Sequence, residues 1–173
     1  FVMGDLVAEL NKRDKELRDS VETKLKRESV SWSWVHMDGD PAAVVVEQAR
    51  LADLVILSRS LEKPRARQPL PLVEDVALHS RAPVLAIPPE GQGFDASRPA
   101  LIAWNGSSEA AAALRAAVPM LRQSQAVKIL VVGAENDTFP SSDAAVYLAR
   151  HGIEAEIHVR AGGSDVADAI SGA

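Results

Sequence analysis

The sequence predicts an α/β protein with an open parallel sheet and helices on both faces of that sheet. Short apolar segments alternate with helical segments along most of the 173 residues, which is the pattern of parallel strands joined by right-handed helical crossovers. Apolar residues make up 47% of the chain, enough to build a packed core. We therefore expect a globular protein whose strands lie beneath helices.

The composition of the chain also argues against nucleic acid and membranes as partners. The formal net charge is −5, with basic residues interleaved among acidic ones, so no patch matches a nucleic-acid backbone. The chain has no cysteine, which excludes disulfides and thiolate chemistry. Its longest apolar runs, AAVVV and ILVVGA, fall well below the roughly 20 residues of a membrane span. We expect a cytoplasmic protein that binds neither nucleic acid nor membrane.

The chain is expected to open with an amphipathic helix over 5–29 that buries a single stripe of leucine and valine side chains. Acidic and basic residues four positions apart, such as Glu22 and Lys26, support its exposed face. The segment SVSWSWVH, 29–36, then alternates with a period of two. That period predicts a half-buried strand near a sheet edge.

A second helix is expected to begin at Asp40 and Pro41, a capping residue followed by a proline at the first helical position. It is predicted to end at about Ala52. The continuous apolar segment that follows, 53–58, is typical of a strand buried on both faces. A helix over 72–80 and another buried strand over 82–88 complete this half of the chain.

Residues 89–98 form the predicted linker, because prolines and glycines interrupt all periodicity there. Beyond the linker the alternation restarts. We expect strands over 100–105, 127–133 and 153–159, and helices over 107–123, 142–152 and 164–173. The sequence therefore predicts two modules, one over 1–88 and one over 99–173.

A weak internal repeat points to the same organisation. Segment 30–49 can be aligned with 153–172, since both show an alternating strand pattern, a glycine turn, a short polar residue and a helix pattern. Two copies of one α/β unit explain the repeat. The copies are cut at different places, so the first shows the later part of the unit and the second the earlier part.

Four blocks in this order resemble the universal stress protein family in its tandem, two-module bacterial form. They are DGDPAAVVVEQARLADLVIL, HSRAPVLAIP, LIAWNGSSEAAAALRAAVPML and YLARHGIEAEIHV. The resemblance implies a five-stranded parallel sheet in the order 3-2-1-4-5 in each module. The first module would lack its first two strands and the second its last two. Alternatively, the two halves complete a single permuted sheet.

Members of the family that bind ATP wrap its phosphates with a glycine-rich loop after the fourth strand. In the first module the corresponding positions are Ser58, Leu61, Pro71 and Leu72. Proline removes an N–H donor and leucine adds a side chain where phosphate would approach. The resemblance therefore argues against ATP binding in this loop.

In the second module the resemblance implies a nucleotide-binding set of Asn105, Gly106, Ser107 and Val132. The first three would lie between a strand and a helix, where open α/β sheets place ligands. Val132 would contact the base through its backbone. ATP or AMP is the expected ligand, and no other cofactor is implied. A structural alternative stands beside this interpretation: Gly106 forms a tight turn and Ser107 caps the helix.

No catalytic or metal site is predicted. The four histidines are not spaced as zinc ligands on a helix, and Asp40 is explained as a helix cap. We expect a non-catalytic stress-response protein, either a homodimer or paired within the chain between modules through the strand at 82–88. The alternatives are an ATP-using enzyme of the wider adenine-nucleotide-binding α/β group and a ligand-free interaction module.

Overall fold

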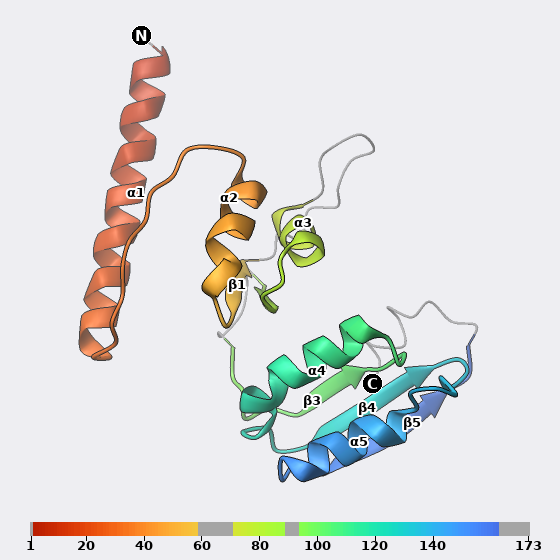
Figure 1. Ribbon diagram of the computed structural model, residues 1–173. Helices are drawn as coiled ribbons and strands as arrows, with labels where there is room; N and C mark the ends of the chain where they lie inside the picture. Colours follow the sequence, from red (N-terminus) through yellow and green to blue (C-terminus); the bar gives the residue numbers. More distant parts are fainter. Residues whose placement is uncertain (1, 59–70, 89–93, 163–173) are drawn as a thin grey trace. The chain divides into compact units, whose positions relative to one another are not determined.

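The computed structural model describes residues 2–58, 71–88 and 94–162. Figure 1 shows the order of their helices and strands. In the first part of the chain these are α1 (Val2–Arg27), α2 (Pro41–Gln48), the short 3-10 helix η1 (Ala49–Leu51), β1 (Val55–Ser58), α3 (Leu72–His79) and β2 (Val84–Ile87). In the second part they are β3 (Ala100–Ala103), α4 (Ser108–Leu121), β4 (Val127–Val132), α5 (Ser141–Arg150) and β5 (Ala155–Arg160).

All pairing between described strands is parallel, so the predicted α/β class is confirmed. One sheet has two strands, β1 and β2, and the other has three, in the order β3-β4-β5. These neighbours agree with the 4-5 and 3-2-1 portions of the predicted strand order. The chain divides into two compact units, Phe1–Val44 and Val45–Ala173. The module boundaries at 88 and 99 stay predictions.

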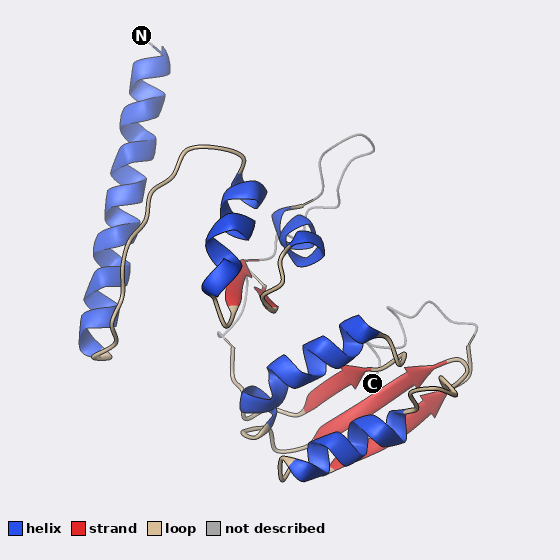
Figure 2. Ribbon diagram, in the orientation of Figure 1, coloured by secondary structure: helices blue, strands red, loops and turns tan. Residues whose placement is uncertain are grey.

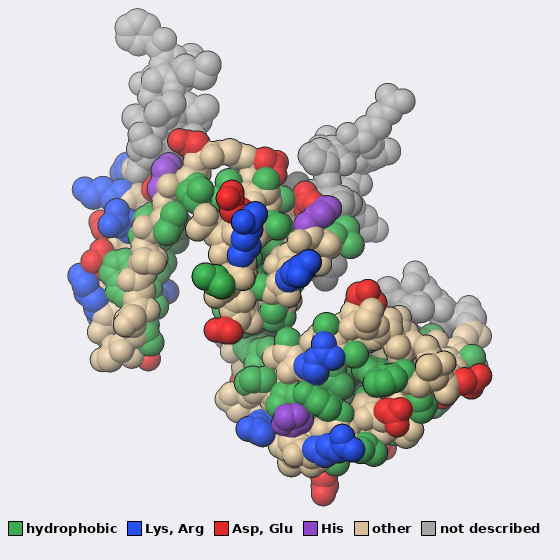
Figure 3. All heavy atoms as spheres, viewed as in Figure 1, with side chains coloured by type: hydrophobic (Ala, Val, Ile, Leu, Met, Phe, Trp, Pro, Cys, Tyr) green, Lys and Arg blue, Asp and Glu red, His purple; other side chains and the backbone are tan. Residues whose placement is uncertain are grey.

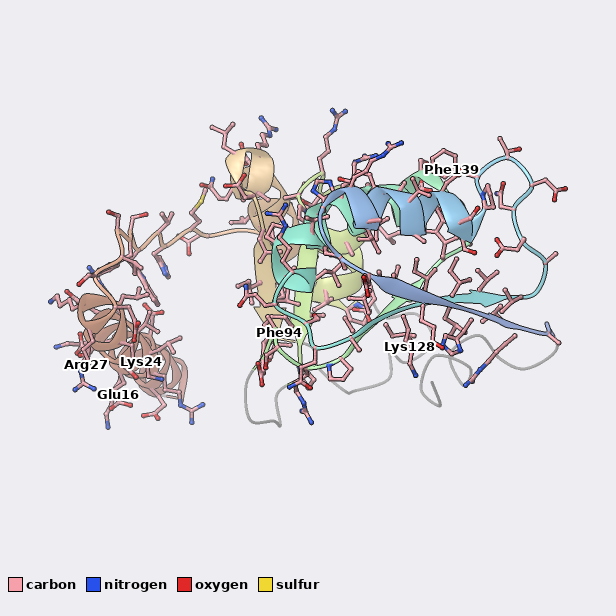
Figure 4. The ribbon with its side chains drawn as sticks, turned by 90° about the horizontal axis from the view of Figure 1, so that it is seen from below. Glu16, Lys24, Arg27, Phe94, Lys128 and Phe139 are labelled. Carbon is pink, nitrogen blue, oxygen red and sulfur yellow. The ribbon has the colours of Figure 1, made fainter. Side chains whose placement is uncertain are left out.

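The main core lies between the three-stranded sheet and the helices α4 and α5. Val127, Ile129 and Val131 alternate along β4 and all join this core. Ile129 and Leu148, from β4 and α5, have no exposed surface, and burying each contributes about 2 kcal/mol. Both helices thus cover the same face of the sheet (Figure 1). Figure 4 shows Phe139 on that side of the sheet and Lys128 on the other.

Several predicted helix ends are confirmed by their hydrogen bonds. The Asp40 carboxylate accepts a hydrogen bond from the Ala43 N–H, 2.9 Å away, at the start of α2. Gly152 follows α5 with a φ of +74°, a conformation that favours glycine after a helix. Glu22 and Lys26 form an ion pair of 2.8 Å on α1. Each of these features depends only on residues close together in the sequence, so each could be predicted from it.

The predicted strand over 29–36 is wrong, because this segment has neither helix nor strand structure (Figure 2). A strand forms only beside a partner that accepts and donates its backbone hydrogen bonds. The described strands pair only within the two sheets given above. The aligned segment of the internal repeat does form a strand, β5, because β4 lies beside it.

The expected burial of β1 and β2 on both faces is also wrong. Ile56 in β1 is 58% exposed, and Ala86 in β2 is exposed as well. Burial alternates with exposure along β1, which is the pattern of a sheet covered on one face only. Apolar side chains on both faces of a strand are buried only if another helix or sheet packs against each face.

The apolar stripe of α1 is less buried than its spacing predicts. Leu17 is 57% exposed, and Val21 and Leu25 are half-buried. A stripe is buried only where another element lies against it, and α1 has no extensive contact with a described helix or strand.

None of the described helices is both long enough and apolar enough to cross a bilayer. The predicted helix over 164–173 lies outside the described residues.

Candidate functional site

The loops that follow β3 and β4 meet at the carboxyl edge of the three-stranded sheet. The β3 loop spans 104–107 and leads into α4, and the β4 loop spans 133–140 and leads into α5. A cavity of about 400 Å³ lies beside them, lined by Gly106, Ser107, Ser108, Ala111, Asn136, Thr138 and Phe139. Open α/β sheets bind ligands at this edge. Two of the predicted nucleotide-binding residues, Gly106 and Ser107, therefore line a real cavity.

The β3 loop is a tight turn held by its own side chains. The Asn105 Oδ1 atom accepts a hydrogen bond from the Ser107 N–H at 3.0 Å. Gly106 has a φ of +74°, which costs any residue with a Cβ atom. The Ser107 hydroxyl accepts a hydrogen bond from the Ala110 N–H at 3.1 Å and caps α4. The structural alternative for these residues is therefore confirmed, whether or not a ligand binds.

The Asn136 side chain connects the two loops by hydrogen bonds. This residue was not identified from the sequence. Its side-chain amide donates a hydrogen bond to the Asn105 carbonyl at 3.4 Å. Its Oδ1 atom accepts hydrogen bonds from the N–H groups of Thr138 and Phe139, both at 3.0 Å. A Cβ atom on residue 106 would lie only 2.6 Å from the Asn136 Cβ. Glycine is needed there because Asn136 occupies the space.

Val132 lies at the same edge of the sheet but is not part of the cavity wall. It is the last residue of β4 and lies opposite Arg160 of β5. The following N–H, of Gly133, donates to the Arg160 carbonyl at 2.8 Å. The structure therefore separates the predicted set: Gly106 and Ser107 line the cavity, whereas Asn105 and Val132 do not.

A carboxylate already caps the N-terminus of α5. The Glu135 side chain accepts hydrogen bonds from the Ser141 N–H at 3.0 Å and from the Ser141 hydroxyl. These bonds favour the charged form and hold the pKa of Glu135 below its ordinary value of 4.5. The partial positive charge at this helix end is therefore compensated from within the protein.

A second carboxylate, Glu109, lies in the first turn of α4. The Glu109 carboxyl is hydrogen-bonded by its own N–H and by the hydroxyls of Ser108 and Ser107. These bonds lower its pKa below 4.5. A helix N-terminus attracts phosphate through free N–H groups and its dipole. Both N-termini beside the cavity instead hold a carboxylate of the protein.

The phosphate-loop positions of the first module are only partly visible. Ser58 is the last residue of β1, and Pro71 occupies the cap position of α3 with a φ of −54° and no capping hydrogen bond. Leu61 and the neighbouring basic residues lie outside the described residues. Within the described ranges, no group of three or more His, Asp or Glu side chains could hold a metal ion.

Asn136, Glu135 and Phe139 are the site residues that sequence reasoning missed. Their common signal is position, because all three follow β4 at the same edge as the predicted turn after β3. The rule that ligands bind at the carboxyl ends of adjacent parallel strands applies to both loops. The resemblance directed attention to the first loop alone.

No protein-family model matches this chain, and no curated protein matches it. Among solved structures, the chain is similar to the crystal structure of a mutant N-acetyl-L-ornithine transcarbamylase complexed with PALAO. The two share 18% sequence identity with a TM-score of 0.22, over 75% of this chain and 52% of that one. The chain thus spans about half the length of that structure. A likeness this weak identifies neither the fold nor an activity.

Proposed function

We propose that this chain is a universal stress protein-like, non-catalytic protein of the cytoplasm that acts in the stress response by binding an adenine nucleotide. The observation that carries the proposal is the cavity at the carboxyl edge of the sheet, with Gly106 and Ser107 in its wall. Its position is where parallel α/β sheets hold nucleotides. Its volume of about 400 Å³ lies within the range of small-molecule sites.

The base and the ribose have suitable partners in this cavity. Phe139 is 46% exposed and offers an aromatic ring against which a base can stack. The hydroxyls of Ser108 and Thr138, also in the wall, can exchange hydrogen bonds with ribose hydroxyls. Binding therefore depends on the nucleoside part of the ligand.

The phosphates contribute little under this proposal. The first turn of α4 carries the Glu109 carboxylate, and the N-terminus of α5 is hydrogen-bonded to Glu135. A phosphate brought to either end would meet a carboxylate instead of a free N–H group. Adenosine, AMP and ATP should therefore bind with similar dissociation constants, whereas a conventional phosphate loop would favour ATP strongly.

Isothermal titration calorimetry with adenosine, AMP and ATP on the full chain tests the proposal. Ser108→Phe places a ring in the cavity wall and should abolish binding of all three ligands. Ser142→Phe is the matched control, because Ser142 is also an exposed serine in the first turn of a helix but lies outside the cavity. Absence of heat with all three ligands would contradict the proposal, and so would equal binding by the two variants.

A ligand-free interaction module is the second candidate, and Asn136 favours it. The three hydrogen bonds of this side chain close the β3 and β4 loops upon each other without any ligand. In that case none of the three nucleosides or nucleotides would raise the melting temperature. The Ser108→Phe variant would then behave like the native chain in every ligand titration.

Pairing through β2 belongs to the same proposal. Among the described strands, β2 pairs only with β1, so it has an edge on which another strand can be added. Addition of a second copy would give a homodimer, and addition within the chain would pair the two modules. Light scattering distinguishes the two, since only the homodimer doubles the mass.

A further inference from the structure

A second cavity lies between α4 and α5, and the proposed nucleotide function does not use it. Its volume is about 310 Å³, at the lower end of the range for small-molecule sites. It is distinct from the cavity beside Gly106, although Phe139 and Ala111 line both. The residues that define its chemistry are Trp104, Phe139, Tyr147, Arg115, Arg150 and Asp143.

Aromatic side chains form the inner surface of this cavity. Trp104 is 3% exposed, and its indole N–H donates to the Phe139 carbonyl at 3.2 Å. The Trp104 and Phe139 rings lie 6.1 Å apart, and the Tyr147 ring completes the wall. Because the indole N–H is already satisfied, the surface offered to a ligand is apolar. Such a surface favours a planar aromatic group.

Two of the apolar side chains that line this cavity are exposed to solvent. Phe139 is 46% exposed and Val146 is 51% exposed, although both lie beside a cavity. In Figure 3 apolar side chains gather over α4 and α5, with basic side chains around them. Exposed apolar side chains beside a concave surface mark a binding site more often than scattered ones do.

The charged side chains around the mouth favour an anion. Arg115 comes from α4, whereas Arg150 and Asp143 come from α5. Two guanidinium groups and one carboxylate leave an excess of one positive charge. Neither arginine forms an ion pair or a side-chain hydrogen bond with another described residue. Both are exposed, so either can turn toward a ligand.

We infer that the cavity between α4 and α5 binds a small aromatic monoanion, such as a carboxylate attached to one or two fused rings. The rings would lie against Trp104, Phe139 and Tyr147. The carboxylate would pair with Arg115 and Arg150, because a planar guanidinium group can form bidentate hydrogen bonds with a carboxylate. A single excess charge matches one carboxylate, not a chain of phosphates. The inference does not depend on nucleotide binding.

NMR with 2-naphthoate as the probe tests the inference. Trp104 supplies a local signal, because its indole N–H lies at the cavity, and the variants Trp32→Phe and Trp34→Phe identify its resonance by elimination. We expect 2-naphthoate to shift the Trp104 resonance and to saturate. The neutral analogue 2-naphthamide should bind about tenfold more weakly, because it lacks the charge that the arginines recognise.

Two variant pairs decide whether the arginines carry the preference. The double variant Arg115→Gln, Arg150→Gln should bind the acid and the amide equally, whereas the control Arg81→Gln, Arg98→Gln should keep the tenfold preference. Ser108→Phe, which alters only the Gly106 cavity, should leave naphthoate binding unchanged. The inference is overturned if the Trp104 resonance does not move, if acid and amide bind the native chain equally, or if Ser108→Phe abolishes naphthoate binding.

Discussion

The Asn136 side chain fills the space beside Gly106 so closely that a Cβ atom on residue 106 would lie 2.6 Å from the Asn136 Cβ. The two residues are 30 positions apart in sequence, yet each restricts the other. Gly106 can adopt its φ of +74° with no steric cost, and Asn136 can reach the Asn105 carbonyl only because residue 106 has no side chain.

Gly106→Ala should lower the free energy of unfolding by about 2–4 kcal/mol, because strain at positive φ adds to a steric overlap. Gly152→Ala is the matched control. Gly152 has the same φ of +74°, but a Cβ there would meet nothing within 4 Å, so we expect a loss of about 1–2 kcal/mol. Urea unfolding measures both. Equal losses for the two variants would mean that the Asn136 contact costs nothing.

Ser107→Ala should lower the free energy of unfolding by about 1 kcal/mol, because the hydroxyl that caps the Ala110 N–H is lost. Ser142→Ala, at an exposed position in the first turn of α5, should change it by less than about 0.5 kcal/mol. Thermal unfolding of the two variants is the measurement. A Ser107→Ala variant as stable as the native chain would contradict a stabilising role for this cap.

Glu135 should make stability depend on pH in the acid range. Its pKa in the folded protein lies below the ordinary 4.5, because Ser141 hydrogen-bonds to the charged form. Its contribution is therefore complete above the unfolded pKa and is lost as the pH falls through the folded pKa. Glu135→Gln removes this dependence, so the gap in stability between native chain and variant should shrink as the pH falls from about 6 to about 3.

Urea midpoints of the native chain and of Glu135→Gln at several pH values provide the comparison. A gap that stays constant over the whole range of pH would contradict a stabilising role for the hydrogen bonds from Ser141 to Glu135.

Leu148→Ala should lower the free energy of unfolding by about 2–5 kcal/mol, because it leaves a cavity at a position with no exposed surface. Val146→Ala, on the same helix but 51% exposed, should change it by no more than about 0.5 kcal/mol. Denaturant unfolding with a constant m-value would measure both. A loss below about 1 kcal/mol at Leu148 would contradict the packing of α5 on the sheet.

The sequence predicted well those features that depend on neighbouring residues. Asp40 and Ser107 cap the helices that follow them, and Gly152 ends α5. Each of these needs only a suitable side chain within three or four positions. The apolar segments that became β3 and β4 were also found, because each is continuous and bounded by turn residues.

Features that depend on a distant partner were not predictable in this way. The alternation over 29–36 is typical of a strand. The residues of this segment do not reveal whether another strand lies beside it. Asn136 binds Asn105 across 31 positions, and Glu135 reaches Ser141 only because the loop between them folds back. For these residues the useful information is the order of the parallel strands, which brings their loops to one edge.

Phe139 belongs to the walls of both cavities, so a ligand that moved its ring in one cavity would reshape the wall of the other. If both proposed ligands bind and one of them moves this ring, their affinities are coupled, and the coupling is reciprocal: whatever factor the first ligand applies to the affinity of the second, the second applies to the first. A single loop residue would then connect two otherwise separate sites without any change of fold.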